Sequence, residues 1–235
     1  SATGKEGRVL KAASIALATR EDGSAVAFVE GTSETDFVAK NELFQALLTK
    51  LSRQSLLFPP SSNAVASLDG ASSLTALEVA ELLDQKPADG EADSFKELVS
   101  KVIFSTGENI VIRRAAVLQS TLISSDPAKR VVVSGYTHGD GRVATAVALQ
   151  SPTASVETLK SFGKDLAMHV AACSPKAIDR QHAEFLKLTD ASGDDFLLSQ
   201  SFIVDDSRTV TQALSKHNAK ISSFLRWERG EILSV

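Results

Sequence analysis

The sequence has few of the residues that build covalent or metal-based sites. It contains 235 residues, among them one cysteine, Cys173, and four histidines. A single cysteine excludes a disulfide within the chain and any zinc site made from several cysteines. The scarcity of cysteine also fits a reducing compartment.

Concentrated basic charge and long apolar runs are missing as well. The chain has 25 lysines and arginines against 29 aspartates and glutamates, a formal net charge of -4, and no segment gathers the basic residues. Direct nucleic-acid binding depends on such a segment, so we expect none except through another protein. The longest apolar runs, such as "VATAVAL", fall far short of the roughly 20 residues that span a bilayer, so no membrane segment is expected. The first residues, "SATGKEGRVLK", have no apolar stretch typical of a secretory signal.

Two segments have the layout of a β-hairpin. Hydrophobic residues make up 43% of the chain, enough for one large core or two small ones. One segment places apolar runs on either side of Asp22-Gly23, and the other on either side of Asp140-Gly141. Asp-Gly between such runs favours a tight turn, because the turn needs positive φ. After each turn, larger side chains alternate with alanine, as half-buried strands require.

Each predicted hairpin is followed by a predicted amphipathic helix. The apolar residues of the two helices share the spacing i, i+7, i+11 and i+14. They are Phe37, Phe44, Leu48 and Leu51 in the first half, and Leu159, Leu166, Val170 and Cys173 in the second. We therefore interpret Cys173 as a core residue.

A second helix and a third strand follow in the first half. Ser94 and Glu97 have the spacing of a capping box, and Gly107 stands where a left-handed C-terminal residue belongs. The strand "NIVIRRAAVL" comes next. In the second half the counterparts are a helix within "SRTVTQALSKHN", ended by Asn218, and the strand "AKISSFLRWE", which places Trp227 in the core.

The order hairpin, helix, helix, strand thus occurs twice. It predicts an α+β fold of two duplicated subdomains, each an antiparallel sheet (a hairpin plus a third strand) packed with helices. We place the N-terminal subdomain at residues 5–122 and the C-terminal one at 123–235. Loops around a short helix near Leu74 to Leu83 are expected in the first half. An irregular connection, 174–200, with one short helix near Ala183 to Leu188, is expected in the second.

The search for catalytic motifs finds none. The sequence has no phosphate-binding loop, no G-x-S-x-G elbow and no H-E-x-x-H pair. His138, Asp140 and Arg142 share a predicted turn, and a solvated turn explains them better than an acid-base pair. His169 has no second histidine four residues away, and we expect a hydrogen-bonded, partly buried side chain rather than a metal ligand. We therefore expect that the protein is not an enzyme and that it binds neither a metal ion nor a cofactor.

The stretch "TSETDFVAKNELF" gives Asp36-Phe37 two interpretations. An acid at a helix N-terminus satisfies free N–H groups and the helix dipole, which stabilises the helix by roughly 0.5–2 kcal/mol. Phe37 would then begin the apolar stripe, and the periodicity alone favours this. In the alternative, the ring is exposed at the mouth of the helix and binds a partner.

Five regions, in order along the chain, resemble motifs of the elongation factor Ts family. The first, "ETDFVAKNELF", resembles the signature T-D-F-V-A-[KR]-[ND]-x-x-F of that family. The others are "GENIVIRRAAVL", "GYTHGDGRVATAV", "LAMHVAACSP", and "LLSQSFIVDDSRTVTQAL" followed by "FLRWERGE". Together they extend from the first half to Glu231.

The resemblance implies a function and a partner. Members of the family are guanine-nucleotide exchange factors for elongation factor Tu, a GTPase of translation elongation. They act without catalytic chemistry, on a core of two subdomains of shared α+β design. The resemblance therefore implies a heterodimer with elongation factor Tu, and it allows a dimer of heterodimers.

The resemblance also implies which residues touch the partner. Asp36 and Phe37 would be the intruding pair, whose ring enters the GTPase domain beside the helices that flank its magnesium site. Thr35 and Val38 would hold the turn. Weaker contacts are implied for Thr106, Gly107, His138, Ile203 and Val204.

Some features depart from the family pattern. The chain starts after the place of the N-terminal three-helix domain of bacterial members, and residues 174–200 are too short for their long helical hairpin. Gln200-Ser201-Phe202 replaces Q-P-F, and Ser33 stands where cysteine is frequent.

The short connection resembles that of mitochondrial members, which implies the mitochondrial matrix as the compartment, with the bacterial cytoplasm or plastid stroma as alternatives. An alternative function is a scaffold subunit that binds and stabilises an elongation factor Tu-like GTPase without stimulating nucleotide release.

Overall fold

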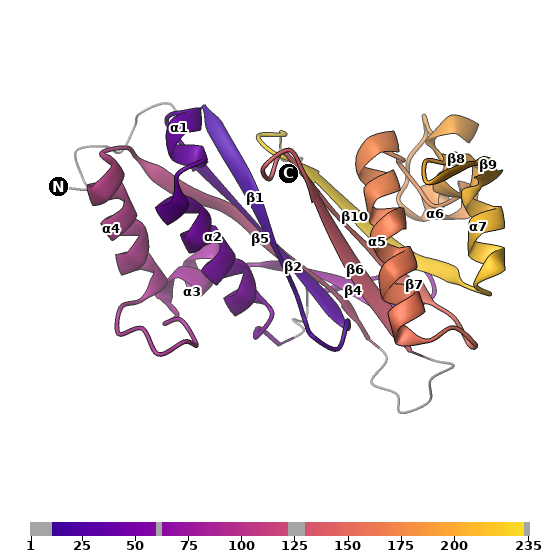
Figure 1. Ribbon diagram of the computed structural model, residues 1–235, viewed down its shortest axis with the longest axis horizontal. Coiled ribbons are helices and arrows are strands. Elements are labelled where there is room, and N and C mark those ends of the chain that lie inside the picture. The colour runs from indigo at the N-terminus through magenta and orange to yellow at the C-terminus, as the bar shows by residue number, and fades with distance from the viewer. Residues whose placement is uncertain (1–10, 60–62, 122–129, 233–235) are drawn as a thin grey trace.

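Two antiparallel sheets face each other in the centre of the molecule, and helices cover both outer faces (Figure 1). The computed structural model describes residues 11–59, 63–121 and 130–232. One sheet has the strand order β1-β2-β5-β4-β3, and the other has the order β10-β7-β6. The layers are therefore helix, sheet, sheet and helix.

The elements follow the chain in two similar series. The first series is β1 (Ala12–Thr19), β2 (Ala25–Ser33), α1 (Asp36–Ala39), α2 (Glu42–Ser55), β3 (Val65–Ala66), β4 (Ser72–Leu77), α3 (Val79–Asp84), α4 (Phe95–Thr106) and β5 (Ile110–Ser120). The second is β6 (Val131–His138), β7 (Val143–Gln150), α5 (Val156–Cys173), α6 (Arg180–Phe185), the 3-10 turns η3 (Gly193–Asp195) and η4 (Leu197–Ser199), β8 (Ser201–Phe202), β9 (Asp205–Thr209), α7 (Val210–Lys216) and β10 (Lys220–Glu228).

The pairing of the strands confirms the predicted α+β fold with a repeated sheet design. In each half a hairpin is joined by a third strand that pairs with the second strand of the hairpin: β5 pairs with β2, and β10 pairs with β7. The first sheet is larger, because β4 and β3 extend it beyond β5. The predicted subdomain boundary at 122/123 and the start at residues 5–10 lie outside the described residues.

The two Asp-Gly turns are confirmed, and each binds the opposite sheet. Gly23 has φ +74° and Gly141 has φ +77°, which a side chain would strain. The Val133 N–H donates to the Gly23 carbonyl at 2.7 Å, and the Ile15 N–H donates to the Gly141 carbonyl at 2.9 Å. A β-carbon on Gly141 would lie 2.6 Å from the Ile15 carbonyl oxygen. Glycine is therefore required there both for the turn and for the contact between sheets.

The alternation of alanine with larger residues separates two cores. In β7, Val147 and Leu149 point outward to the core under α5 and α7, whereas the alanines of that strand point inward. The inner core between the sheets consists of Ile15, Val26, Phe28, Ala71, Ala116, Leu118, Val131, Val133, Ala144, Ala146, Ala148 and Trp227. The three alanines of β7 lie in this core beside larger side chains, and small residues at such positions let two sheets pack closely.

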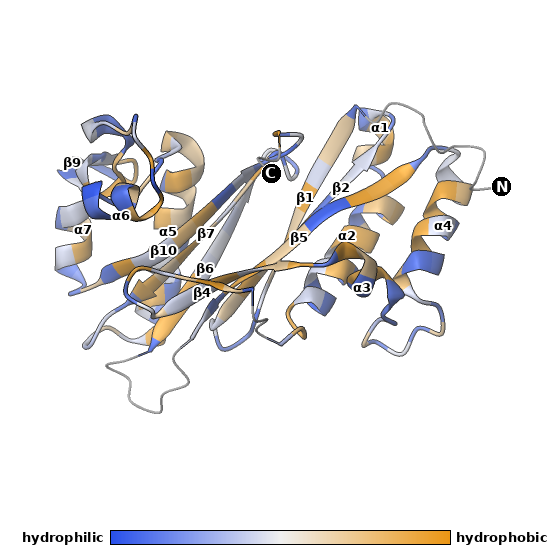
Figure 2. Cartoon of the chain, turned by 180° about the vertical axis from the view of Figure 1, so that it is seen from behind, coloured by the Kyte–Doolittle hydropathy of each residue, from blue (hydrophilic) through white to orange (hydrophobic). Residues whose placement is uncertain are grey.

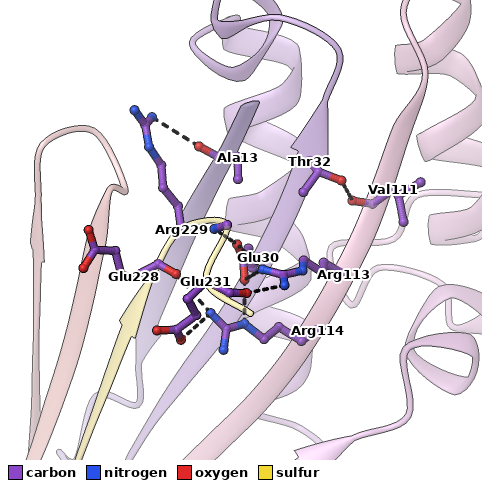
Figure 3. A network of polar contacts seen from close by, with 10 residues as sticks. Ala13, Glu30, Thr32, Val111, Arg113, Arg114, Glu228, Arg229 and Glu231 are labelled. Carbon is purple, nitrogen blue, oxygen red and sulfur yellow. Dashed lines mark hydrogen bonds and ion pairs between the residues drawn. The ribbon is translucent and has the colours of Figure 1, made fainter. Parts of the chain in front are cut away.

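A buried carboxylate joins the two sheets at one edge of this core (Figure 3). Glu30 on β2 is fully buried, and it accepts hydrogen bonds from Arg113 Nη1 at 3.2 Å and Arg114 Nε at 2.5 Å. The Gly230 N–H, just after β10, donates to the same carboxylate at 2.7 Å. Arg114 Nη2 also lies 2.8 Å from Glu231 Oε1. The C-terminal end of the second sheet is thereby fixed to the first.

Arg114 also supports the aromatic part of the inner core. Its guanidinium lies 3.9 Å from the centre of the Trp227 ring, and Trp227 packs against Phe28 with ring centres 5.3 Å apart. Figure 2 shows the hydrophilic middle of β5, which carries Arg113 and Arg114, between two hydrophobic stretches. The placement of Trp227 in the core is confirmed.

A cluster of hydroxyl groups joins the sheets on the other side. Ser72 Oγ on β4 lies 2.8 Å from Ser222 Oγ, which donates to Asp69 Oδ1 at 2.7 Å. The register shift of β10 between Ile221 and Ser223 occurs at this contact. Burial works against ionisation of Asp69, but hydrogen bonds, of which the one from Ser222 is the largest, lower the pKa of this carboxyl below its usual value.

The prediction of a helix near Leu74 to Leu83 is wrong in its first half. Residues Ser72–Leu77 form β4, which pairs with β5, and α3 begins only at Val79. Leu74 and Leu77 have the spacing of one helical turn, but Ser72 and Thr75 are buried in the sheet. The long-range pairing therefore decides the structure of a segment whose local pattern is ambiguous.

The predicted helix ends are largely confirmed. Ser94 and Glu97 form a capping box, and Gly107 ends α4 with φ +76°. Asn218 follows α7 with φ +47°, as its predicted role requires. However, α7 begins only at Val210, because the residues before it form β9. No helix of the described residues is both long and apolar enough to cross a membrane.

The connection between α5 and β8 is short and mostly irregular, as predicted. Its one α-helix, α6, lies slightly earlier than expected, at Arg180–Phe185. Leu159, Leu166 and Val170 on α5 are buried as expected, whereas Cys173 is only half-buried at the end of the helix. Burial nevertheless raises the pKa of the Cys173 thiol.

His169 on α5 is a buried, hydrogen-bonded side chain, as predicted. Its Nε2 lies 2.9 Å from Gln200 Oε1, and its Nδ1 accepts the Ile203 N–H at 3.3 Å. These two contacts together require a neutral ring with the proton on Nε2. Burial lowers the pKa of His169 below its usual value of 6.5, although the hydrogen bond with Gln200 opposes the shift.

Glu30→Gln is expected to lower the free energy of unfolding by about 3–5 kcal/mol, because it removes the fully buried carboxylate that Arg113 and Arg114 share, and the Glu231 carboxylate compensates only Arg114. Urea denaturation followed by circular dichroism measures the effect. Glu228→Gln is the matched control, since that side chain is 41% exposed and pairs with Arg226 at 3.2 Å, and it should cost at most about 1 kcal/mol. Equal losses in the two variants would contradict the role given to Glu30.

Stability should also fall in mild acid because of His169. The lowered pKa means that the unfolded chain binds a proton more readily than the folded one, so stability is complete above pH 6.5 and declines as the pH falls below that value. NMR titration of the His169 ring protons and denaturation between pH 7.5 and 5 check this. His169→Gln should flatten the decline, and a ring that titrates at or above its usual value would overturn the expectation.

Candidate functional site

The stretch that begins at Thr35 forms two helices rather than one. Helix α1 ends at Ala39, and α2 begins at Glu42 after Asn41, whose side chain accepts the Leu43 N–H at 2.9 Å. The expectation of one continuous apolar stripe from Phe37 is therefore wrong. A seven-residue spacing does not reveal that a capping asparagine interrupts the helix.

Phe37 lies outside the core altogether. Its side chain is 90% exposed, whereas Phe44 and Leu48, the next residues of the expected stripe, are fully buried under the sheet. The interpretation of Phe37 as a core residue is thus wrong, and the alternative of an exposed ring at the mouth of a helix is correct. The capping residue is Thr35, whose Oγ1 accepts the Val38 N–H at 3.4 Å, and Asp36 is an acid in the first turn.

Val38 anchors the short helix from the inside. It is 7% exposed and packs with Ala39 into the core beneath α2 and α4. Because α1 has a single turn, these two inward side chains and the Thr35 cap set its orientation. Asp36 and Phe37 are consequently held outward while Val38 points inward.

A carboxylate from the far end of α4 holds this turn in place. Glu108 accepts the Thr35 N–H at 2.9 Å and the Thr35 hydroxyl at 2.6 Å. Beside it, the Asn109 N–H donates to Glu34 Oε1 at 2.7 Å. Thr106 and Gly107, two of the weaker candidates, precede Glu108 directly, so the structure brings them beside α1.

The β6–β7 turn, which follows His138, is connected to α1 by a series of hydrogen bonds. The Ser14 hydroxyl donates to the Asp140 carbonyl at 3.1 Å, which fixes the β6–β7 turn to β1. Gln45 on α2 then donates to both Ser14 Oγ at 3.0 Å and the Ala39 carbonyl at 2.5 Å. The turn that carries the exposed His138 is therefore tied to α1 across the two halves.

Ile203 and Val204 form a separate exposed site in the second half. They lie in the β8–β9 turn with 41% and 48% of their surface exposed, above the buried Phe202. His169 holds this turn by accepting the Ile203 N–H. The turn does not touch α1, but both elements, and the β6–β7 turn between them, lie along the upper edge of Figure 1.

Two positioning residues were missed in the sequence. Glu108 acts on Thr35 from 73 positions away, and Gln45 acts on Ser14 from 31 positions away. Neither separation leaves a local pattern, although Glu108 lies within the "GENI" run already noted.

The arrangement is suited to binding a protein surface. Within the described parts of the chain, no group of three or more histidine, cysteine, aspartate or glutamate side chains could hold a metal ion. The site instead offers an exposed aromatic ring next to an acid, on a turn that hydrogen bonds hold from two directions. Such a rigid ring can enter an apolar pocket of a partner at little conformational cost.

Comparison with known proteins agrees with this arrangement. The family model "Elongation factor TS" matches residues 34–191. The Elongation factor Ts of Methylorubrum populi is 30% identical over 265 aligned residues, which cover 97% of this chain and 77% of that protein. The Elongation factor Ts of Methylobacillus flagellatus is 31% identical over 254 residues (96% and 75%), and that of Nitratiruptor sp. is 30% identical over 263 residues (97% and 78%).

The matched span includes α1, the end of α4, the β6–β7 turn and α5, so it contains most of the candidate site. The repeated sheet design, the family match and the relatives together show that the chain belongs to the elongation factor Ts family of translation elongation factors.

Proposed function

We propose that this protein is a guanine-nucleotide exchange factor for elongation factor Tu. The observation that carries the proposal is the exposure of Phe37, 90% of its side chain, on a turn locked by Glu108 and anchored by Val38. Exposing a whole phenylalanine ring gives up roughly 1.5–3 kcal/mol of burial energy. A partner that buries the ring recovers this energy, which supports a binding role.

The proposed action is to loosen GDP in the partner. Asp36 and Phe37 enter the GTPase domain beside its magnesium site, with Thr35 and Val38 holding the turn. A bound nucleoside diphosphate depends on Mg²⁺ and on backbone N–H groups around its phosphates. Moving either one weakens the hold on GDP, and no bond of the nucleotide is made or broken.

Exchange of this kind follows from linkage between two binding sites. If the factor weakens GDP binding by a given ratio, then GDP weakens binding of the factor by the same ratio. Incoming GTP can therefore displace the factor. No catalytic acid, base or metal is needed from this chain, so we propose that it is not an enzyme.

Other exposed residues would extend the contact. Thr106 and Gly107 lie beside α1, and His138 lies on the turn tied to it. Ile203 and Val204 would meet a different part of the partner, because they are on the second half along the same edge. We propose a one-to-one complex, and a mass measurement would reveal any pairing of two such complexes.

The short connection between α5 and β8 supports an organellar partner. Between α5 and β8 the described chain has only α6 and two 3-10 turns, with no long helical hairpin. We therefore propose elongation factor Tu of the mitochondrial matrix as the partner. The relatives named above are bacterial, so release assays with mitochondrial and bacterial elongation factor Tu in parallel test the choice, and a preference for the bacterial protein would reverse it.

Phe37→Ala is expected to slow the stimulated release of GDP by at least about tenfold, the size expected for losing a central aromatic contact. The measurement is the release rate of a fluorescent GDP analogue from elongation factor Tu at rising concentrations of this protein. The thermal midpoint should not change, because the ring makes no core contact.

Leu57→Ala is the control for this experiment. Leu57 is 62% exposed, and it follows the end of α2 opposite α1, so release should stay at the wild-type rate. Tight binding of the wild type without faster release would instead support a scaffold subunit that stabilises the GTPase. Wild-type stimulation that Phe37→Ala fully retains would contradict the intruding ring.

Glu108→Ala is expected to loosen α1 and to slow stimulated release several-fold, because Thr35 loses both hydrogen bonds to the carboxylate. Hydrogen exchange at the α1 amides, together with the release assay, separates the two effects. Glu81→Ala on the exposed face of α3 is the control. Unchanged protection of the α1 amides would show that Glu108 does not position the turn.

A further inference from the structure

Phe104 on α4 is exposed in a way that the packing of its helix does not explain. The core face of α4 consists of Phe95, Val102 and Ile103, which are all buried. Phe104 lies on the opposite face with 86% of its side chain exposed. Among the described residues, only Phe37 and Ile232 are large apolar side chains exposed to a similar extent.

The helix does not need this ring for its own stability. It begins with the capping box of Ser94 and Glu97 and ends with the left-handed Gly107. The residues around Phe104 on the outer face, Ser100 and Lys101, are exposed and polar, as a solvated helix face requires. A phenylalanine in that setting loses burial energy without gaining a contact.

The position of Phe104 relates it to Phe37. It lies in the last turn of α4, one turn before Glu108, and Glu108 binds Thr35 at the start of α1. Phe37 follows Thr35 by two residues. The two most exposed phenylalanine rings of the described chain therefore lie on either side of the hydrogen-bonded contact between Glu108 and Thr35, which we call the joint.

Further apolar surface lies next to α1. Leu43 is 51% exposed in the first turn of α2. Apolar side chains that gather around a rigid joint are typical of a protein-binding surface.

We propose that Phe104 is a second anchor for the same GTPase, an inference that rests on the proposed function. Its occupant is the surface of the partner next to the pocket that receives Phe37, because the joint at Glu108 fixes the two rings relative to each other. The partner must therefore present two apolar depressions, one for each ring. This widens the exchange surface from α1 onto the outer face of α4.

The two rings would have different tasks. Phe104 is fixed on a helix of 12 residues that is capped at both ends. Its binding to the partner therefore costs little conformational entropy and adds affinity. Phe37 stands on a single turn at the point of intrusion, so it acts on the nucleotide site. Phe104 thus sets how tightly the partner binds, whereas Phe37 sets how fast GDP leaves the complex.

The test measures GDP release as a function of factor concentration, with elongation factor Tu loaded with a fluorescent GDP analogue. Phe104→Ala should raise the half-saturating concentration about tenfold or more, as for an anchor residue, and keep the plateau rate. Phe37→Ala should instead lower the plateau. Leu57→Ala should leave both unchanged, and all three variants should keep the wild-type melting temperature.

The outcomes separate this inference from the proposed function. If the wild type stimulates release and Phe104→Ala matches Leu57→Ala, the second anchor is wrong and the exchange function stands. If Phe104→Ala lowers the plateau alone, the division of tasks is wrong. If the wild type binds without stimulating release, the exchange function fails, and the equilibrium dissociation constant of Phe104→Ala then decides whether Phe104 anchors the partner.

Discussion

The relative placement of the two sheets depends on the buried carboxylate of Glu30. A charge removed from water must be matched by close partners, or it strongly destabilises the fold. Two of its partners, Arg113 and Arg114, belong to the same sheet, and a third, the Gly230 N–H, comes from the end of the chain. The carboxylate can therefore be satisfied fully only when the second sheet is docked in one position.

This placement also fixes how the exposed candidate residues of the two halves lie relative to one another. The helices α1, α2 and α4 are on the outer face of one sheet, and the β6–β7 turn comes from the other sheet. Ser14 and Gln45 join the two, so the position of His138 relative to Phe37 follows from how the sheets are packed. What the fold supplies is a fixed arrangement of exposed side chains, and under the proposed exchange function the energy would come from burying them on the partner.

The features that sequence analysis predicted are those that a few neighbouring residues determine. The two Asp-Gly hairpins, the capping box at Ser94 and the left-handed Gly107 all belong to this class. The strand β4 was missed because its pairing with a distant strand overrides a helical spacing. The exposure of Phe37 could not be read from periodicity, since Asn41 interrupts the helix, and only the resemblance of the signature pointed to it. Contacts such as Glu108 with Thr35 left no sequence pattern at all.

The docking of Gly230 on Glu30 has a consequence for how the chain matures. Synthesis proceeds from the N-terminus, so Glu30 and both arginines leave the ribosome long before residues 228–231 do. Until then the carboxylate lacks its last donor, and the alanine-rich face of β7 has no closed core to complete. The two halves can therefore dock completely only after residues 228–231 have been translated and have left the ribosome.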